Sequence, residues 1–125
     1  MKDLKISGLN FDIVWKDKKE NFRRIEELLG NTPTDLFVLP EMFTTGFYMN
    51  PEEIADRQNE TLDWMKSFAK KTDTAICGSA SVYENNHFFN RFYFVLPDGS
   101  YDQYDKRHLF SFTGEDKKYS AGTER

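Results

Sequence analysis

One carboxylate in this sequence stands where a fold could put it to chemical use. Glu41 lies in LPEMFTTGFY. Only Pro40 separates it from the apolar segment Asp35–Leu39, which is typical of a strand buried on both faces. Functional groups of α/β folds gather at the carboxyl ends of strands, and a carboxylate held there can serve as a base. The alternative is a loop acid in water, the usual environment of glutamate. The local sequence is compatible with both.

Two further residues invite a chemical interpretation. Lys106 follows Tyr101–Tyr104 at the expected end of another strand, although a lysine in an Asp-Lys-Arg-His run is normally part of a solvated surface. Cys77 is the only cysteine, and therefore the first candidate for a thiol nucleophile. It lies inside TAICGSASV, however, where small and apolar neighbours indicate a buried strand. We expect Cys77 to be structural.

The elements before Glu41 predict a β-α-β unit. Alternation over Leu4–Leu9 indicates a first strand. Five apolar residues then recur close to helical spacing: Trp15, Phe22, Ile25, Leu28 and Leu29. Gly30 stands where a helix C-terminal glycine belongs, and Asp35–Leu39 is the second strand. This order predicts parallel pairing of the two strands.

The elements after Glu41 continue the α/β pattern. A helical turn is expected at 51–53 and a second helix from Glu60 to about Lys71. Three strands follow, at Thr74–Tyr83, Phe88–Leu96 and Tyr101–Lys106. Residues 110–122 show neither the helical nor the strand period, and the chain looks cut off.

Composition limits the classes of protein to which the chain can belong. Residues 1–125 are enough for one modest domain, and the 16% aromatic share predicts a packed core. The formal net charge of -4, with basic residues interleaved among acids, argues against nucleic-acid binding. No signal peptide is recognisable, and no stretch approaches the roughly 20 apolar residues that cross a bilayer. We therefore expect a cytoplasmic protein with no membrane partner and, with only two histidines, no metal site.

Five motifs in order resemble the nitrilase (carbon-nitrogen hydrolase) superfamily, and within it the omega-amidase branch. They are LPEMFTTGF, CGSASV, FNRFYFVLPDG, YDKRHLF and TGEDKKYSAG, and they extend over essentially the whole chain. The resemblance implies an α/β fold, the four-layer α-β-β-α sandwich of that family, with residues 1–125 as its N-terminal part. It implies no cofactor, and it implies a homodimer or higher oligomer, since the family commonly pairs sandwiches.

The resemblance also assigns roles to individual residues. Glu41 matches the family's general base, Lys106 matches the lysine that stabilises the tetrahedral oxyanion, and Glu115 matches a second glutamate. A carboxylate is a suitable acceptor for a thiol proton, and a fixed ammonium group offsets the charge that develops on a carbonyl oxygen. For Glu115 the alternative is a solvated acid.

Residues near these groups are candidates for the pocket wall. Phe43 and Tyr48 follow the base closely and are expected to contact substrate, although aromatic residues more often belong to a core. His108 follows the lysine, and a packing role is an equal alternative. Asn90 and Arg91 match the family pattern too, and for both we expect structural hydrogen bonding rather than catalysis.

The implied reaction is hydrolysis of a small amide to a carboxylate and ammonia through a cysteine thioester. The expected substrates are ω-amides of dicarboxylates, such as 2-oxoglutaramate. In the family the nucleophile lies beyond the second glutamate, where this sequence has ended, so residues 1–125 are expected to be inactive alone. One alternative is a noncatalytic binding or assembly module on the same scaffold. A weaker one is a flavodoxin-like binding domain, which would lack its glycine-rich phosphate loop.

Overall fold

The computed structural model describes residues 3–46, 48, 50–107 and 119–122. Its helices and strands follow one another as β1 (Ile6–Gly8), α1 (Lys18–Leu29), β2 (Leu36–Val38), α2 (Pro51–Ile54), α3 (Glu60–Thr72), β3 (Ala75–Glu84), β4 (His87–Val95) and β5 (Tyr101–Asp105). The predicted elements are present, with the first two strands shorter than expected. None of the described helices is long and apolar enough to cross a membrane.

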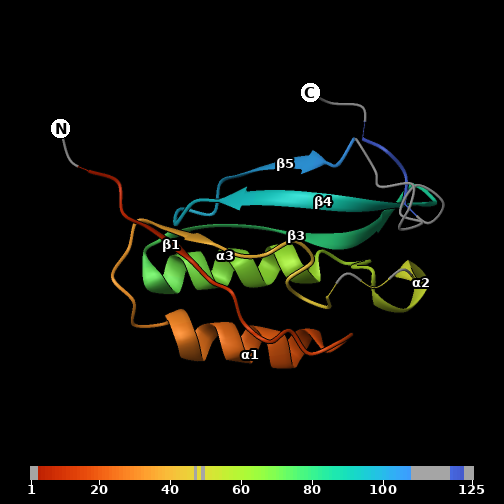
Figure 1. Cartoon of the computed structure of the whole chain (residues 1–125). Coiled ribbons are helices and arrows are strands. Elements are labelled where there is room, and N and C mark those ends of the chain that lie inside the picture. Colours follow the sequence, from red (N-terminus) through yellow and green to blue (C-terminus); the bar gives the residue numbers. More distant parts are fainter. Residues whose placement is uncertain (1–2, 47, 49, 108–118, 123–125) are drawn as a thin grey trace.

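Five strands form one sheet in the order β1-β2-β3-β4-β5 (Figure 1). The pairs β1–β2 and β2–β3 are parallel, and the pairs β3–β4 and β4–β5 are antiparallel. The parallel pairing predicted for the first β-α-β unit is confirmed. The ladder between β3 and β4 places Cys77 opposite Phe94 and Ser81 opposite Asn90. This register decides which side chains share a face of the sheet.

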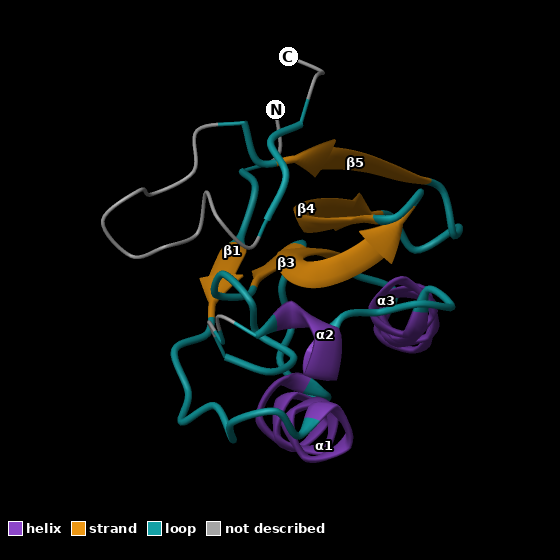
Figure 2. Cartoon of the chain, turned by 90° about the vertical axis from the view of Figure 1, so that its right-hand side faces the viewer, coloured by secondary structure: helices purple, strands orange, loops and turns teal. Residues whose placement is uncertain are grey.

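Helices α1 and α3 lie on the same side of the sheet (Figure 2). Helix α1 begins after Asp17, whose side chain accepts a hydrogen bond from the N–H of Glu20 at 3.2 Å. It is followed by Gly30, at the position that the sequence predicts, although this glycine keeps a right-handed backbone (φ -56°). Helix α3 carries Lys70 and Lys71 in its last turn, where positive charge is favourable. Sequence signals at the ends of both helices therefore correspond to their observed limits.

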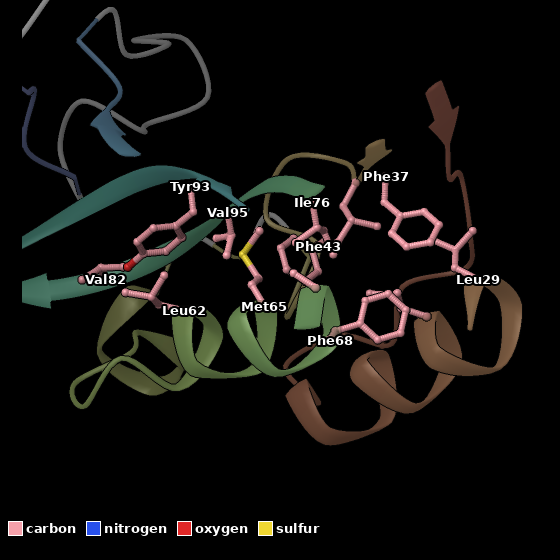
Figure 3. Close-up of a cluster of buried hydrophobic side chains, with 13 residues drawn as sticks. Leu29, Phe37, Phe43, Leu62, Met65, Phe68, Ile76, Val82, Tyr93 and Val95 are labelled. Atoms are coloured by element: carbon pink, nitrogen blue, oxygen red, sulfur yellow. The ribbon is translucent and has the colours of Figure 1, made fainter. Parts of the chain in front are cut away.

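The hydrophobic core fills the space between the sheet and these helices (Figure 3). From the strands, Phe37 and Tyr93 are fully buried. From the helices, the ring of Trp64 stacks between those of Phe22 and Phe68, with centroids 4.5 and 5.1 Å apart. Aromatic pairs of this kind add about 0.5–1.5 kcal/mol to what burial alone contributes. This packing fixes α1 and α3 to one face of the sheet.

Three apolar residues lie differently from expectation. Trp15 precedes α1 instead of belonging to its buried face, and it is 61% exposed. Leu28 is 54% exposed, because the buried stripe of α1 runs through Ile25 and Leu29. Val38 is 37% exposed, so β2 is not buried on both faces. Within the described part of the chain, helices cover only one side of the sheet.

We call the side of the sheet turned away from α1 and α3 the open face. Side chains alternate along a strand, so the open face carries the neighbours of the core residues Ile76 and Tyr93. On β3 and β4 these are Cys77, Ser79, Ser81, Asn90, Phe92 and Phe94. Polar and aromatic side chains therefore stand next to one another on the open face.

Candidate active site

Glu41 stands on a turn that is fastened to β3. Leu39 still pairs with this strand, since its N–H donates to a carbonyl oxygen of β3 at 2.9 Å. Pro40 has no N–H and ends the pairing. Just past Glu41, the N–H of Met42 donates to Ser79 Oγ at 3.0 Å. Anchors on both sides therefore hold Glu41 at the carboxyl end of β2.

Lys106 follows β5 and is held through its backbone on both sides. Its N–H donates to the carbonyl oxygen of Asn90 at 2.9 Å, and its own carbonyl oxygen accepts the N–H of Gly122 at 3.0 Å. A Cβ at position 122 would lie 2.1 Å from the carbonyl oxygen of Asp105, so a side chain does not fit here. The backbone that carries the lysine is thus clamped between β4 and residues 119–122.

A buried arginine anchors the same strand end. The Arg91 side chain is 4% exposed and donates to both carboxylate oxygens of Asp105, at 2.7 and 3.1 Å, and to those of Glu84. Burial disfavours its charge, but hydrogen bonds with Asp105 and Glu84 outweigh burial and raise the pKa of Arg91. Such two-pronged pairs fix orientation. Arg91 has the structural role that the sequence predicts.

Glu41 and Lys106 meet although 65 residues separate them in sequence. Lys106 Nζ lies 3.3 Å from Glu41 Oε2, and Asn90 Nδ2 donates to the same oxygen at 3.0 Å. The side chains of Glu41 and Lys106 are 46% and 21% exposed, so both groups reach solvent. A carboxylate can move a proton, and an adjacent ammonium group can offset charge that develops on a bound molecule.

A pocket of about 390 Å³ opens beside this pair. It is lined by Leu39, Glu41, Gly78, Ser79, Asn90, Phe92, Tyr104 and Lys106. A few charged and polar groups among apolar walls are typical of sites for small molecules. The described residues include no cluster of three or more His, Cys, Asp or Glu side chains able to hold a metal ion.

Comparison with known proteins assigns the chain to a family. The carbon-nitrogen hydrolase family matches residues 5–124, nearly the whole chain. The chain belongs to the carbon-nitrogen hydrolase family. Its curated relatives include omega-amidase YafV of Yersinia enterocolitica, 44% identical over 126 residues, and omega-amidase YafV of Escherichia coli K12, 39% identical over 126 residues.

The alignments cover this carbon-nitrogen hydrolase chain completely but its relatives only in part. Both omega-amidases are covered over 49% of their length. A solved structure, XC1258 from Xanthomonas campestris, is a CN-hydrolase superfamily protein with an arsenic adduct in its active site; it matches with a TM-score of 0.93 at 37% identity. The match covers 100% of this chain and 48% of XC1258. The predicted nitrilase-type α/β fold is confirmed, and the chain spans about half the length of these relatives.

The two aromatic residues predicted to wall the pocket of this carbon-nitrogen hydrolase lie elsewhere. Phe43 is fully buried in the core, because the left-handed backbone of Met42 (φ 54°) turns the chain back toward the helices. Tyr48 places its ring edge-on to Trp15, and its carbonyl oxygen accepts a hydrogen bond from the Tyr119 hydroxyl at 3.3 Å. Neither Phe43 nor Tyr48 lines the pocket.

Two other predicted site residues, Glu115 and His108, lie outside the described residues, and their roles stay predictions. Tyr119, the first described residue after this segment, is 3% exposed. Its hydroxyl hydrogen bonds to Ser81 Oγ on the open face at 3.1 Å. Residues 119–122 are thus attached both to β3 and, through Gly122, to Lys106.

Cys77 is a buried residue of β3 rather than a pocket residue. It is 6% exposed, and burial raises the pKa of its thiol. The thiolate is the nucleophilic form of cysteine, so a raised pKa makes the thiol less reactive. This environment agrees with the structural role predicted for Cys77.

Sequence reasoning missed the wall of the pocket on the open face. Ser79 lies opposite Phe92 in the ladder between β3 and β4, and Phe92 lies opposite Tyr104 in the ladder between β4 and β5. All three therefore project from the same face, toward the pocket. Counting along the strands in steps of two, with the register known, would have identified them. The register itself was not evident from the residues.

Proposed function

We propose that this protein hydrolyses a small amide, with Glu41 as general base and Lys106 as the group that stabilises the oxyanion. The observation that carries the proposal is the approach of these two side chains to 3.3 Å beside a pocket. The fold brings them together across 65 residues of sequence. Membership of the carbon-nitrogen hydrolase family supports this class of reaction.

The proposed reaction has two halves. In the first, Glu41 accepts the proton of a cysteine thiol, and the sulfur attacks the amide carbon. Lys106 offsets the negative charge that develops on the carbonyl oxygen. Glu41 then gives its proton to the leaving nitrogen, so that ammonia departs and a thioester remains. In the second half, Glu41 takes a proton from water, and the water oxygen attacks the thioester carbon. The carbon–sulfur bond then breaks, and Glu41 returns the proton to the departing sulfur, so that the thiol is restored and the acid product is released.

We assign the thiol to a cysteine other than Cys77, since the Cys77 side chain is buried and does not line the pocket. The chain spans about half the length of the curated relatives it matches, and we place the nucleophile in sequence beyond residues 1–125. On this proposal, residues 1–125 alone have a base and a lysine but no nucleophile. They are expected to release no ammonia.

The proposed substrates are ω-amides of small dicarboxylates, such as 2-oxoglutaramate. Two relatives named omega-amidase support this choice. A pocket of about 390 Å³ with mainly apolar walls and a few charged groups suits a molecule of this size. Neither a metal ion nor an organic cofactor takes part in the proposed reaction.

The decisive experiment measures ammonia release from ω-amides by the complete gene product that contains residues 1–125. We expect Glu41→Gln and Lys106→Ala each to lower turnover by about 10³-fold or more, because they remove the base and the oxyanion stabiliser. Circular dichroism and thermal unfolding should change little, since both side chains are partly exposed. Normal turnover in either variant would reject the assignment.

A second ion pair offers a matched control. Lys16 Nζ and Glu53 Oε2 are also 3.3 Å apart, and both side chains are about half exposed. Neither Lys16 nor Glu53 lines the pocket, so Lys16→Ala and Glu53→Gln should leave turnover unchanged. A folded gene product that binds ω-amides without hydrolysing them would instead favour the noncatalytic module.

We also propose that the complete protein is cytoplasmic and forms a homodimer or a higher oligomer. Light scattering coupled to size-exclusion chromatography measures the second property directly. A monomer over the working range of concentration would reject it.

A further inference from the structure

Asn90 touches both groups of the candidate pair. Its side-chain Nδ2 donates to Glu41 Oε2 at 3.0 Å, and its backbone carbonyl oxygen accepts the N–H of Lys106 at 2.9 Å. Lys106 Nζ lies 3.3 Å from the same Oε2. The second carboxylate oxygen of Glu41, Oε1, makes no hydrogen bond within the part of the chain that the structure describes. One oxygen of Glu41 is thus occupied, and the other is available to a reacting group.

We propose that Asn90 is a positioning residue for the reaction. It holds Oε2 of Glu41 so that Oε1 faces the incoming thiol, and its backbone sets the distance between Glu41 and Lys106. This inference rests on the proposed function, since it assigns Asn90 a task in that same reaction.

Asn90 is held more firmly than the carboxylate it contacts. It is 2% exposed and lies within β4, opposite Ser81 of β3. The next residue, Arg91, is tied to Asp105 by two hydrogen bonds. Glu41, by contrast, lies on a turn with a side chain that is 46% exposed. A half-exposed carboxylate keeps one orientation only when a rigid neighbour fixes it, and Asn90 is such a neighbour.

A neutral amide suits this position because Lys106 has two tasks. Its ammonium group contacts Glu41 in the structure, and it must turn toward the oxyanion when charge develops there. Asn90 continues to hold Glu41 while Lys106 turns away. An alanine at position 90 would leave Oε2 to Lys106 alone, and an aspartate would repel Glu41.

The test compares Asn90→Ala with Asn90→Asp in the complete gene product, with an ω-amide as substrate. We expect Asn90→Ala to lower kcat by about 10–100-fold, because a misplaced base reacts slowly, and to change KM by less than about threefold. The acid limb of the pH–rate profile should move to higher pH, because the carboxylate loses a donor that favours its charged form. Among the described residues, the ionisable groups that line the pocket with Glu41 are Lys106 and Tyr104.

Asn90→Asp keeps the shape of the side chain, and therefore reports on the amide even if Asn90→Ala folds poorly. Its acid limb should move further, because two carboxyl groups would then share the site. Gln103→Ala is the matched control: it removes an exposed amide from β5, opposite Tyr93 and therefore on the other face of the sheet. Its kcat and pH profile should equal those of the wild type.

Two results would overturn the inference. The first applies when Glu41→Gln inactivates the gene product, as the proposed function requires. If both Asn90 variants then keep the wild-type kcat and the wild-type acid limb of the pH–rate profile, Asn90 does not position Glu41. If the wild type releases no ammonia from any ω-amide, the proposed function itself fails. Crystal structures of the wild type and of Asn90→Ala then test the positioning role directly. A Glu41 carboxylate that is displaced in Asn90→Ala would support this role, and a carboxylate in the wild-type position is the second result that would overturn it.

Discussion

The two faces of the sheet differ in how completely they are covered. Under α1 and α3, Phe37, Ile76 and Tyr93 are fully buried. On the open face, Phe92 is 39% exposed and Tyr104 is 36% exposed. The covered face has the close packing that specifies a fold, and the open face carries the groups of the candidate site.

The two faces are linked, because the packing of one face determines which side chains project from the other. Because side chains alternate, the register that buries Tyr93 also puts Asn90 on the open face. A slip of one residue in β4 would exchange Asn90 for Arg91 and bring a guanidinium group toward Glu41. The core is therefore a condition for the site, although Phe37, Ile76 and Tyr93 do not themselves line the pocket.

The largest expected effect is a difference in stability between two single variants, each of which removes one aromatic ring from one face of the sheet. Phe37→Ala should destabilise the 125-residue chain by about 3–5 kcal/mol, because it leaves a cavity in the core. Phe92→Ala should cost about 1 kcal/mol or less, because much of its ring is already in water. Urea unfolding followed by tryptophan fluorescence measures both. Equal losses of unfolding free energy in the two variants would contradict this prediction and would mean that the open face is also packed in solution.

Alkaline pH should act mainly through the covered face. Burial raises the pKa of Tyr93 to about 12, against the opposing effect of the nearby Arg91 charge. An unfolded tyrosine ionises near pH 10, so this stabilisation is complete below about pH 10 and is lost as the pH rises through 12. The free energy of unfolding should fall by up to roughly 2–3 kcal/mol over this pH range.

Tyr93→Phe isolates that contribution. The Tyr93 hydroxyl is buried and has no hydrogen-bond partner among the described residues, so the variant should be at least as stable as the wild type at pH 7. Its stability should also fall less between pH 10 and 12. Tyr104→Phe, on the open face, is the control. An alkaline loss that persists unchanged in Tyr93→Phe would show that another group is responsible.

Glycines provide a third comparison, between a crowded and an empty position. A Cβ at Gly78 would lie 2.8 Å from the ring of Phe43, which is fully buried and has no room to move. Gly78→Ala should therefore cost about 1–3 kcal/mol through overpacking. At Gly8 nothing lies within 4 Å, so Gly8→Ala should be neutral or slightly stabilising. Thermal unfolding of the two variants measures the difference, and similar midpoints would contradict it.

The smallest expected effect is that of Cys77→Ser on activity. The Cys77 thiol is buried and its pKa is raised, so replacing it should leave ammonia release by the complete gene product within about twofold of wild type. Stability should fall by about 1 kcal/mol, because a hydroxyl replaces an apolar thiol. Loss of turnover in a folded Cys77→Ser variant would show that Cys77 takes part in the reaction.

Much of the fold was predictable because its signals are local. The apolar stripe of α1, the glycine that follows it and the alternating strands each depend on residues close in sequence. The position of Glu41 at the end of β2 could be predicted in the same way, and the roles proposed for Glu41 and Lys106 come from a resemblance that extends along the chain. Trp15 was assigned to the wrong element because helical spacing alone does not show that Asp17 caps the helix.

The rest could not be predicted because it depends on register and on single backbone angles. Phe43 enters the core because Met42 has a positive φ, which is uncommon for a residue other than glycine and is not signalled by methionine. The contact between Asn90 and Glu41 spans 49 residues and requires the pairing of β2, β3 and β4 to be known. Side-chain contacts of this range follow from tertiary structure and not from local pattern.

The backbone of Lys106 is held by β4 and by residues 119–122, and this has a consequence for the order in which the candidate site forms during folding. Contact between Glu41 and Lys106 closes a loop of 65 residues, and the entropic cost of closure grows with loop length. Helix α1 and the first two strands depend on nearer neighbours, whereas the lysine reaches the base only when β5 has joined β4. A nascent chain that has left the ribosome only as far as β2 therefore presents Glu41 without Lys106, and the pair can form only after β5 has joined β4.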